Sequence, residues 1–412
     1  MTRTYSDEVG PFYTMDTVME EAQRCLLCLD APCSAECPAG TDPAKFIRSV
    51  RFRNLKGAAE TIRENNALGG ICARVCPTER YCQQACSRCG IDRPIDIGGI
   101  QRFVTDFEHT VGMEILKKGE KNGKKIAIIG SGPSGLQAAA SLLELGYEVD
   151  IFEQAEKAGG YLRYGIPEYR LPNAVVDREI ERIEKLGAKF YCKVCIGRDR
   201  TIEDLKNTYD AVLAAVGFSA GKMLPMFEGN EYAETAVEFL ARVKANEGKE
   251  EAPDHALVIG GGDVAMDVAT TLKRLGTKRV TDVAYEELSE FLASEKELEG
   301  ARKAGVTILD GYVPEQVDKQ TVTFKHRHMD AELTITADKI ILAVGQKPDL
   351  DGLGLEGKEK AGEAEGYETA DPKVFITGDL ALGDKTVVWA VRKGKEAAQS
   401  IHKSLQERGS RL

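Results

Sequence analysis

The stretch KIAIIGSGPSGLQAAASLLELGYEVDIFE, residues 125–153, contains an apolar strand, a glycine-rich turn, an Ala/Leu-rich helix and a second apolar strand. This order predicts a βαβ unit. Gly130 lets the chain turn, Gly132 lets the backbone approach a pyrophosphate, and Gly135 permits close packing of the helix. Glu153 ends the second strand at the distance expected of an acid that bonds a ribose hydroxyl, so the stretch predicts a dinucleotide-binding fold.

A second unit of the same kind begins at HALVIG, residues 255–260, and continues through a helix to the strand RVTDVAY, residues 279–285. Its turn, GGGDVA, has Gly260 and Gly262 in the dinucleotide spacing. Ala265 takes the third place, where a small side chain still allows close packing. Two nucleotide-binding halves are therefore expected in one chain.

The residues that follow this second strand indicate which nucleotide binds. The strand ends in Tyr285, Glu286 and Glu287, where an enzyme that selects the 2′-phosphate of NADP would carry Arg or Lys. A carboxylate repels that phosphate and accepts bonds from a free ribose diol, so the sequence favours NAD, with Glu286 ahead of Glu287. The alternative is that both glutamates are solvated surface residues.

A third signal lies near the C-terminus, in VFITGDLALGDKTVVWAVRKGKEAA, residues 374–398. An apolar strand runs into Gly378 and Asp379, and a helix is expected from about Val387. We expect this strand to return to the first nucleotide-binding domain, with Asp379 bonding a polyol and the helix start facing a flavin ring. An ordinary loop acid is the alternative for Asp379.

The N-terminal part of the chain is rich in thiols, because nine of the eleven cysteines lie between Cys25 and Cys89. The first block, RCLLCLDAPCSAECP (residues 24–38), has gaps of two, four and three residues between its cysteines and a proline after the last. This spacing partly matches the ferredoxin run, in which three cysteines hold one cluster and the fourth reaches a second. The second block, CARVCPTERYCQQACSRC (residues 72–89), makes two clusters possible. A pair of structural zinc sites is the alternative.

The segment that carries these thiols has helical spacing. Thr17 followed by Glu20 predicts a capped helix start, with an apolar stripe that continues to Leu27. Cys25 and Cys28 would then share one face of this helix, one turn apart. Further helical segments are KFIRSV (45–50) and AAETIRENN (58–66).

Cys192 and Cys195 form a separate Cys-x2-Cys unit within FYCKVCIG. A thioredoxin-like redox pair sits at a helix start, whereas this segment is typical of a strand. Residues three apart on a strand point to opposite faces, so we interpret both cysteines as packing residues.

Length and charge limit the class of protein. A chain of 412 residues is long enough for two or three domains, and a net charge of −11 without a Lys/Arg block argues against a nucleic-acid partner. The N-terminus has acidic residues where a secretory signal needs an apolar run, and no segment is continuously apolar over a bilayer's width. We therefore expect a cytoplasmic protein with no membrane partner, in which the cysteines serve metal or redox chemistry.

Taken together, the cysteine blocks, GSGPSG with Glu153, GGGDVAMD and the TGD segment resemble one family. They are similar to the flavin and iron–sulfur electron-input chain shared by glutamate synthase small subunits and dihydropyrimidine dehydrogenases. The resemblance covers essentially the whole chain and is greatest to the bacterial NAD-dependent dihydropyrimidine dehydrogenase input subunits. It rests on RCLLCLDAPC, ENNALGGICARVCPTE, PIDIGGIQRFVTDFE, YGIPEYRLP, ASEKE and GDKTVV. NADP-using relatives carry a basic pair where this sequence has Tyr285 and Glu286.

The resemblance implies FAD, NAD(H) and two [4Fe–4S] clusters, with no catalytic side chain because hydride transfer is centred on the cofactors. The first cluster would be held by Cys25, Cys28, Cys33 and Cys86, and the second by Cys37, Cys76, Cys82 and the amide of Gln101. FAD would lie on Gly130, Gly132, Pro133, Gly135, Glu153, Gly160, Arg170, Gly378, Asp379 and Thr386. NAD would lie on Gly261, Gly262, Asp263, Val264, Glu286, Ala343, Val344 and Gly345. This assignment leaves Cys72 and Cys89 free, and a surface glutamine is the alternative for Gln101.

The implied fold is α/β, with a helical iron–sulfur domain at 1–118 followed by two Rossmann-like domains. These are an FAD-binding domain at 119–230 and 347–412 and an NAD-binding domain at 231–346. The chain would take hydride from NADH onto FAD and pass electrons through the clusters to an FMN and iron–sulfur partner subunit, which reversibly reduces uracil or thymine. A heterotetramer is expected. The alternatives are a glutamate synthase small subunit, a thioredoxin-reductase-like flavoenzyme that uses Cys192 and Cys195, and a zinc scaffold.

Overall fold

The computed structural model describes residues 4–355 and 366–409, which form two compact units. The predicted domain ranges also include residues 1–3, 356–365 and 410–412, which lie outside the described residues. The cysteine-rich segment and the first glycine-rich turn both belong to unit 2. Unit 1 is Met1–Val9, Tyr164–Pro172 and Ser219–Lys347, and unit 2 is Gly10–Arg163, Asn173–Phe218 and Pro348–Leu412.

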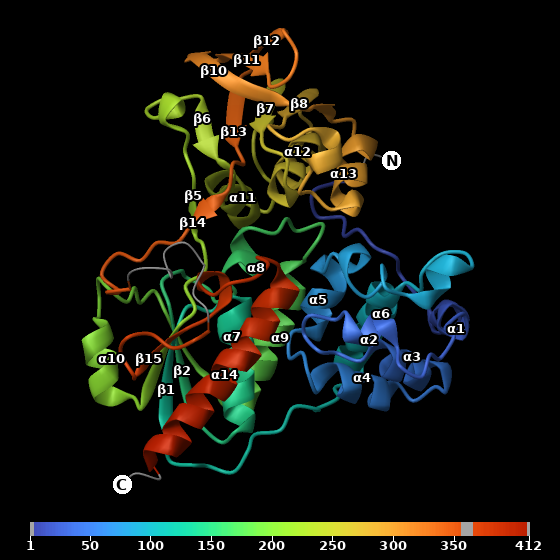
Figure 1. Cartoon of the computed structure of the whole chain (residues 1–412), viewed down its shortest axis with the longest axis vertical. Coiled ribbons are helices and arrows are strands. Elements are labelled where there is room, and N and C mark those ends of the chain that lie inside the picture. The colour runs from blue at the N-terminus through green and yellow to red at the C-terminus, as the bar shows by residue number, and fades with distance from the viewer. Residues whose placement is uncertain (1–3, 356–365, 410–412) are drawn as a thin grey trace. The chain divides into compact units, whose positions relative to one another are not determined.

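A five-stranded parallel sheet with the order β15-β4-β1-β2-β3 lies in unit 2. The C-terminal strand β15 pairs with β4, which confirms that this strand returns to the first nucleotide-binding sheet. In Figure 1 the long helix α14 runs beside α7. The two helices can approach closely because α14 carries Gly394, where a Cβ would lie 2.3 Å from the carbonyl oxygen of Ser134. The elements are β1 (Lys125–Ile129), α7 (Pro133–Glu144), β2 (Glu148–Glu153), α8 (Tyr161–Tyr164), α9 (Asn173–Leu186), β3 (Lys189–Cys192), α10 (Ile202–Thr208), β4 (Ala211–Ala214), β15 (Val374–Ile376), η6 (Gly378–Leu380) and α14 (Val387–Gly409).

The cysteine module of unit 2 is helical, as predicted, and packs around Val18, Phe46, Ile62 and Val104. Its elements are α1 (Met15–Gln23), α2 (Pro32–Ala35), α3 (Pro43–Arg51), α4 (Leu55–Arg63), α5 (Gly69–Val75), η1 (Thr78–Arg80), η2 (Ser87–Gly90) and α6 (Ile97–Thr110).

The predicted start of the first helix is wrong by one turn. Thr14 is the N-cap of α1, and Thr17 closes the capping box from inside the helix. The helix ends at Gln23, and the backbone reverses at Leu27, whose φ is 55°. Cys25 therefore lies in a loop rather than on a helix face.

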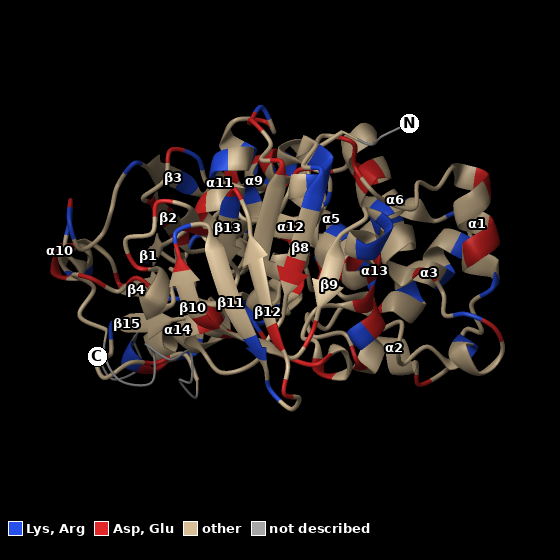
Figure 2. Ribbon diagram, turned by 90° about the horizontal axis from the view of Figure 1, so that it is seen from above, with Lys and Arg blue, Asp and Glu red and all other residues tan. Residues whose placement is uncertain are grey.

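Unit 1 contains a second five-stranded parallel sheet, with the order β6-β13-β7-β8-β9. The antiparallel sheet β10-β11-β12, seen in Figure 2, shares an apolar core with it, in which Val322 and Phe324 meet Leu257 and Leu342. Helices α11 and α12 pack through a separate core around Phe239. The elements are β5 (Ala220–Gly221), η3 (Pro225–Phe227), β6 (Ala233–Thr235), α11 (Ala236–Ala245), β7 (His255–Ile259), α12 (Asp263–Leu275), β8 (Arg279–Val283), η4 (Leu288–Glu290), α13 (Glu295–Lys303), β9 (Thr307–Leu309), β10 (Tyr312–Asp318), β11 (Thr321–His326), β12 (Glu332–Thr336), β13 (Lys339–Leu342) and β14 (Gln346–Lys347).

The distribution of charge and the character of the helices bear on the possible partners of the chain. Figure 2 shows acidic and basic residues interspersed among the elements. Within residues 4–355 and 366–409, none of the helices combines the length and the apolar character needed to cross a bilayer.

Candidate iron–sulfur, flavin and nucleotide sites

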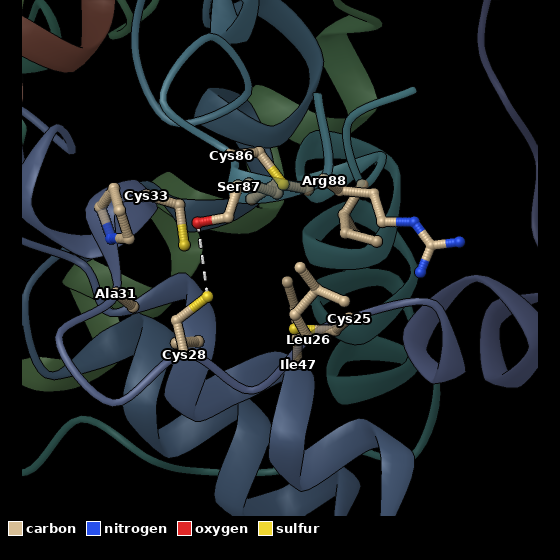
Figure 3. A pocket seen from close by; sticks show the side chains of 13 residues that line it. Cys25, Leu26, Cys28, Ala31, Cys33, Ile47, Cys86, Ser87 and Arg88 are labelled. Atoms are coloured by element: carbon tan, nitrogen blue, oxygen red, sulfur yellow. Dashed lines mark hydrogen bonds between the residues drawn. The ribbon is translucent and has the colours of Figure 1, made fainter. Parts of the chain in front are cut away.

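Four cysteines from both predicted blocks line one cavity of the cysteine module, with about 370 Å³ not filled by protein atoms and partly open to solvent. The loop after α1 supplies two of them, α2 supplies the third, and the residue before η2 supplies the fourth. Figure 3 shows their sulfur atoms turned toward a common space, where the Cys28 thiol donates a hydrogen bond to the Ser87 hydroxyl at 3.5 Å. The four are Cys25, Cys28, Cys33 and Cys86, the set that the resemblance assigns to the first cluster.

Burial makes two of these thiols weaker acids. It raises the pKa of Cys33 to about 11, and the neighbouring thiols of Cys86, Cys25 and Cys28 add to the rise. Burial raises the pKa of Cys25 as well. Four thiolates therefore cannot share this cavity unless positive charge joins them. The irons of a cluster supply that charge, so this donor set fits a [4Fe–4S] cluster.

A single zinc ion fits this arrangement less well. Zinc holds its sulfur ligands at about 2.3 Å, which draws four sulfur atoms tightly together. Thiols spaced around a cavity suit several irons instead, because each thiolate then binds a different iron of the cluster.

A second group of thiols surrounds the end of α5. Cys76 directly follows α5, one turn after Cys72. Burial raises the pKa of Cys72 to about 12, and the nearby thiol of Cys37 adds to the rise. Burial also raises the pKa values of Cys76 and Cys82, and Cys37 contributes to both. Cys37 therefore acts on the other three thiols, and we call these four the second group, although Cys33 of the first cavity also raises the pKa of Cys82.

This group differs from the implied ligand set in one member. Cys72, which the resemblance leaves free, lies within it, and the four-residue spacing of CARVC on a helix was the sequence signal for this position. Gln101 lies on α6, and its Nε2 donates to the carbonyl oxygen of Gly69 at 2.8 Å, so the amide is held beside α5. Its role as a ligand stays a prediction. Cys89 is exposed and its thiol donates to the carbonyl oxygen of Gln83 at 3.4 Å.

Cys192 and Cys195 do not have the arrangement of a thioredoxin-like redox pair. Cys192 ends β3, and the backbone turns at Lys193, whose φ is 60°, so the predicted strand stops before Cys195. Both thiols are free. Neither cysteine lies at a helix start, the position that activates a redox dithiol.

The first glycine-rich turn, between β1 and α7, has the geometry that a bound pyrophosphate needs. Gly130 has a φ of 100°, and a Cβ there would lie 2.5 Å from the carbonyl oxygen of Ala215. A Cβ at Gly135 would lie 2.2 Å from the carbonyl oxygen of Gly130. A Cβ at Gly132 would meet no atom within 4 Å, so open space lies above the start of α7, where Pro133 is the first residue. This open cradle at a helix N-terminus fits the diphosphate of FAD.

Glu153 is buried at the end of β2 and holds this turn. Its carboxylate accepts hydrogen bonds from the backbone N–H of Ser131 at 3.1 Å and of Ala155 at 2.8 Å. Gly160 has a φ of 51°, and a Cβ there would lie 2.8 Å from the Cα of Gly132. The segment after β2 therefore lies against the glycine-rich turn, where it could form one side of the cofactor site.

The end of β15 meets the same turn. Gly378 has a φ of 68°, and a Cβ there would lie 2.6 Å from the Ser134 hydroxyl. Burial raises the pKa of the neighbouring Asp379. The hydroxyl of Thr377 is buried and has no hydrogen-bond partner among the described residues, so this edge offers an unused polar group to a ligand. Thr386 directly precedes α14, in the position expected for a helix start that faces a flavin.

Arg170 is the one implied FAD residue that belongs to unit 1. It is partly buried, and its guanidinium forms ion pairs with Asp267 at 2.6 Å and Glu297 at 2.9 Å. Its contact with FAD stays a prediction.

The second glycine-rich turn, between β7 and α12, repeats the construction of the first. Gly260 has a φ of 154°, and a Cβ there would lie 2.5 Å from the carbonyl oxygen of Ala343. A Cβ at Gly262 would meet no atom within 4 Å. Asp263 begins α12, and its carboxylate accepts a hydrogen bond from the backbone N–H of Ser294 at 2.6 Å.

The loops that follow β8 and β13 approach this turn, because both strands are neighbours of β7. A Cβ at Gly261 would lie 2.5 Å from a carboxylate oxygen of Glu286, so this side chain reaches over the turn. Glu287 instead accepts a hydrogen bond within its own loop, from the backbone N–H of Glu290. The geometry thus favours Glu286 over Glu287 as the acid that faces a ribose. The segment 343–345 directly follows β13, and Val264 is the second residue of α12.

Comparison with known proteins identifies the family of the chain. Residues 2–113 match the family described as dihydropyrimidine dehydrogenase domain II, 4Fe-4S cluster, and residues 124–407 match pyridine nucleotide-disulphide oxidoreductase. The NAD-dependent dihydropyrimidine dehydrogenase subunit PreT of Escherichia coli K12 is 56% identical over 405 residues, 98% of each chain. The glutamate synthase [NADPH] small chain of the same strain is 30% identical and covers 92% of this chain and 90% of its own.

Solved structures support the fold of the nucleotide-binding part. FprA of Mycobacterium tuberculosis, in complex with NADPH, superposes with a TM-score of 0.59 at 18% identity, over 70% of this chain and 85% of that chain. With a 4Fe–4S domain, a pyridine nucleotide oxidoreductase domain and identity along nearly its full length, the chain is an oxidoreductase that belongs to the family of NAD-dependent dihydropyrimidine dehydrogenase subunits.

Proposed function

We propose that the chain is the electron-input subunit of a cytoplasmic dihydropyrimidine dehydrogenase. It takes hydride from NADH onto FAD and feeds electrons through two [4Fe–4S] clusters to an FMN-containing partner, in a heterotetramer that reversibly reduces uracil or thymine. The observation that carries this proposal is the cavity lined by Cys25, Cys28, Cys33 and Cys86, which lies in the same compact unit as the flavin-type glycine turn.

Direct contacts join the second thiol group to the elements that would hold the flavin. Lys395 on α14 donates to the carbonyl oxygen of Ala39, two residues after Cys37, at 2.8 Å. The Tyr81 hydroxyl, next to Cys82, donates to the Asp384 carboxylate at 2.9 Å. Thiols and flavin-type turn are therefore held as one body, which suits electron transfer over a fixed distance.

The side chains of this chain serve to place cofactors rather than to move protons. FAD, when bound, accepts a two-electron hydride and releases single electrons, so no side-chain acid or base is needed for that step. Lys393 is buried on α14 and donates to the carbonyl oxygens of Ala381 and Asp384, at 3.0 Å and 3.2 Å. It thereby fixes the loop that precedes the helix start expected to face the flavin.

The proposal is tested on the full chain, purified without oxygen. We expect a brown-yellow protein that contains flavin and iron, oxidises NADH with an artificial acceptor, and leaves uracil unreduced until the FMN-containing subunit is added. Uracil reduction by the purified chain alone, or zinc in place of iron by elemental analysis, would overturn it.

A glutamate synthase small subunit is the second candidate, supported by the 30% identity to such a chain. That relative is named for NADPH, whereas this chain carries Glu286 over its second glycine-rich turn. Co-purification separates the two candidates, because a glutamate synthase subunit would bring down a large amidotransferase chain and no pyrimidine-reducing partner.

A further inference from the structure

The loop that carries Glu286 is braced by a segment from elsewhere in unit 1. Residues 284–287 follow β8, and the turn between β11 and β12 contains Arg327. The backbone N–H of Gly311 donates to the carbonyl oxygen of Glu286 at 3.0 Å, and that of Arg327 donates to the carbonyl oxygen of Gly311 at 2.8 Å. The two segments therefore lie side by side.

The Arg327 side chain makes three contacts with this loop. Its guanidinium lies over the Tyr285 ring, 4.2 Å from the centroid. The same group donates to the carbonyl oxygen of Tyr285 at 3.2 Å and pairs with the Glu290 carboxylate at 3.2 Å. A planar guanidinium can stack on a ring while one of its nitrogens donates both hydrogen bonds, and an ammonium group lacks the flat face for such a stack.

The position of the loop decides where the Glu286 carboxylate points. Tyr285 and Glu286 are consecutive, so a clamp on the ring and carbonyl of the first fixes the backbone that carries the second. The Glu286 carboxylate reaches over Gly261, which is where a ribose beside the glycine-rich turn would lie.

We propose that Arg327 is a positioning residue that sets nucleotide selectivity, because its clamp on Tyr285 and Glu290 holds the Glu286 carboxylate over Gly261. The inference rests on the proposed binding of NAD(H) at this turn. Although Arg327 is a cation next to the nucleotide loop, its effect is to favour the nucleotide without a 2′-phosphate. Its charge is met by Glu290, and the carboxylate that it positions repels phosphate.

The test is calorimetric titration of the full chain with NAD⁺ and with NADP⁺, at pH 8 and without oxygen. The oxidised nucleotides carry the same adenosine half as the reduced ones but no hydride, so binding is measured apart from turnover.

The measured quantity is the ratio of the two dissociation constants. We expect Glu286→Gln to lower the preference for NAD⁺ about tenfold, because one repulsive charge near a phosphate is removed. Arg327→Met should lower it about fivefold or more, mostly through weaker NAD⁺ binding. The double variant should match Glu286→Gln alone, because the two residues act through one carboxylate.

Two further variants complete the design. Arg279→Met removes an exposed arginine at the opposite end of β8, and it should leave the ratio within twofold of the wild type. Tyr285→Leu removes the stacking face from an exposed position, and it should reproduce Arg327→Met even if that variant folds poorly. A ratio unchanged by both Arg327→Met and Tyr285→Leu, or effects that multiply in the double variant, would overturn the inference. If the wild type binds neither nucleotide, the proposed function fails with it.

Discussion

Cys33 is the thiol of the first group whose environment is most fully defined, because three other cysteines line its cavity and burial raises its pKa to about 11. We expect Cys33→Ser to remove about half of the iron of the chain, since a cluster that loses one of four thiolate ligands is poorly held. Iron analysis with the visible spectrum measures this. Cys89→Ser, the same change at an exposed cysteine outside both groups, should keep the full iron content. Equal iron in the two variants would contradict the assignment.

The buried carboxyl of Asp282 leads to a prediction about stability. It is fully buried on β8, and within the described residues neither carboxylate oxygen has a hydrogen-bond partner. Burial raises its pKa well above the ordinary value, and Glu286 adds to the rise. Because its folded-state pKa lies above the unfolded one, the contribution of Asp282 to stability is most favourable at low pH and falls as the pH rises above about 4. Asp282→Asn should therefore raise Tm by a few degrees at pH 8, with a smaller gain at pH 5.

The control for Asp282 is the exposed Asp318 in the same unit. Asp318→Asn should change Tm by less than a degree or so at either pH, because an exposed carboxylate has no burial cost to relieve. A gain for Asp282→Asn that is independent of pH would show that the carboxyl is not the titrating group.

Individual site residues could be predicted from the sequence where their role depends only on residues nearby in the chain. Gly130, Gly132 and Gly260 could be found because each role, a turn or a close approach, is local to a few residues. Arg327 could not, because its partner Tyr285 lies on another element and the contact exists only after the hairpin packs. Cys86 joined Cys33 only through the family resemblance, since spacing alone cannot say which thiols share a cavity.

At the scale of elements, a buried ion network joins the cysteine module to the flavin-type sheet. Arg63 on α4 pairs with Glu108 on α6 at 2.7 Å and with Glu179 on α9 at 2.8 Å. Arg182 pairs with both of these carboxylates. We expect Arg63→Met to cost about 3–5 kcal/mol in urea unfolding, because carboxylates are left buried with one cation fewer. Arg48→Met, at an exposed position on α3, should cost less than about 0.5 kcal/mol.

The same network sets an acid limit. Although burial raises the pKa of Glu179, the adjacent Arg63 and Arg182 lower it below its ordinary value. A lowered folded-state pKa means that the stabilisation is present above about pH 4.3 and is lost as the pH falls. The urea midpoint of the wild type should therefore fall toward acid pH, and that of Arg63→Met should fall less.

Helices and strands were predicted best where side chains within the element determine them. The apolar periodicity after the glycine-rich turns predicts helices over residues 134–145 and 264–275, each within one residue of the bounds of α7 and α12, and the start of α14 at Val387. The start of α1 was missed because two threonines three residues apart, Thr14 and Thr17, can each act as N-cap. Only the reciprocal bonds between them decide which one does.

For the whole molecule, this architecture predicts that the substitution of one cysteine can abolish electron delivery to a partner and leave NADH oxidation intact. Oxidation of NADH with ferricyanide needs only the nucleotide and flavin sites, because a small oxidant can reach a flavin directly. Under the proposed function, delivery of electrons to a partner protein needs the thiol groups as well. Cys82 belongs to the second group. The residue before it, Tyr81, contacts the loop that precedes α14.

We expect Cys82→Ser to keep NADH–ferricyanide activity within about twofold, while uracil reduction by the chain mixed with its FMN-containing partner falls at least about tenfold. Cys89→Ser should keep both activities, because this exposed cysteine lies outside both thiol groups. The two rates are measured on the same anaerobic preparation, so a loss of folded protein would lower both together. If Cys82→Ser supported uracil reduction at the rate of Cys89→Ser, electrons would have to leave the flavin by a route that avoids the second thiol group.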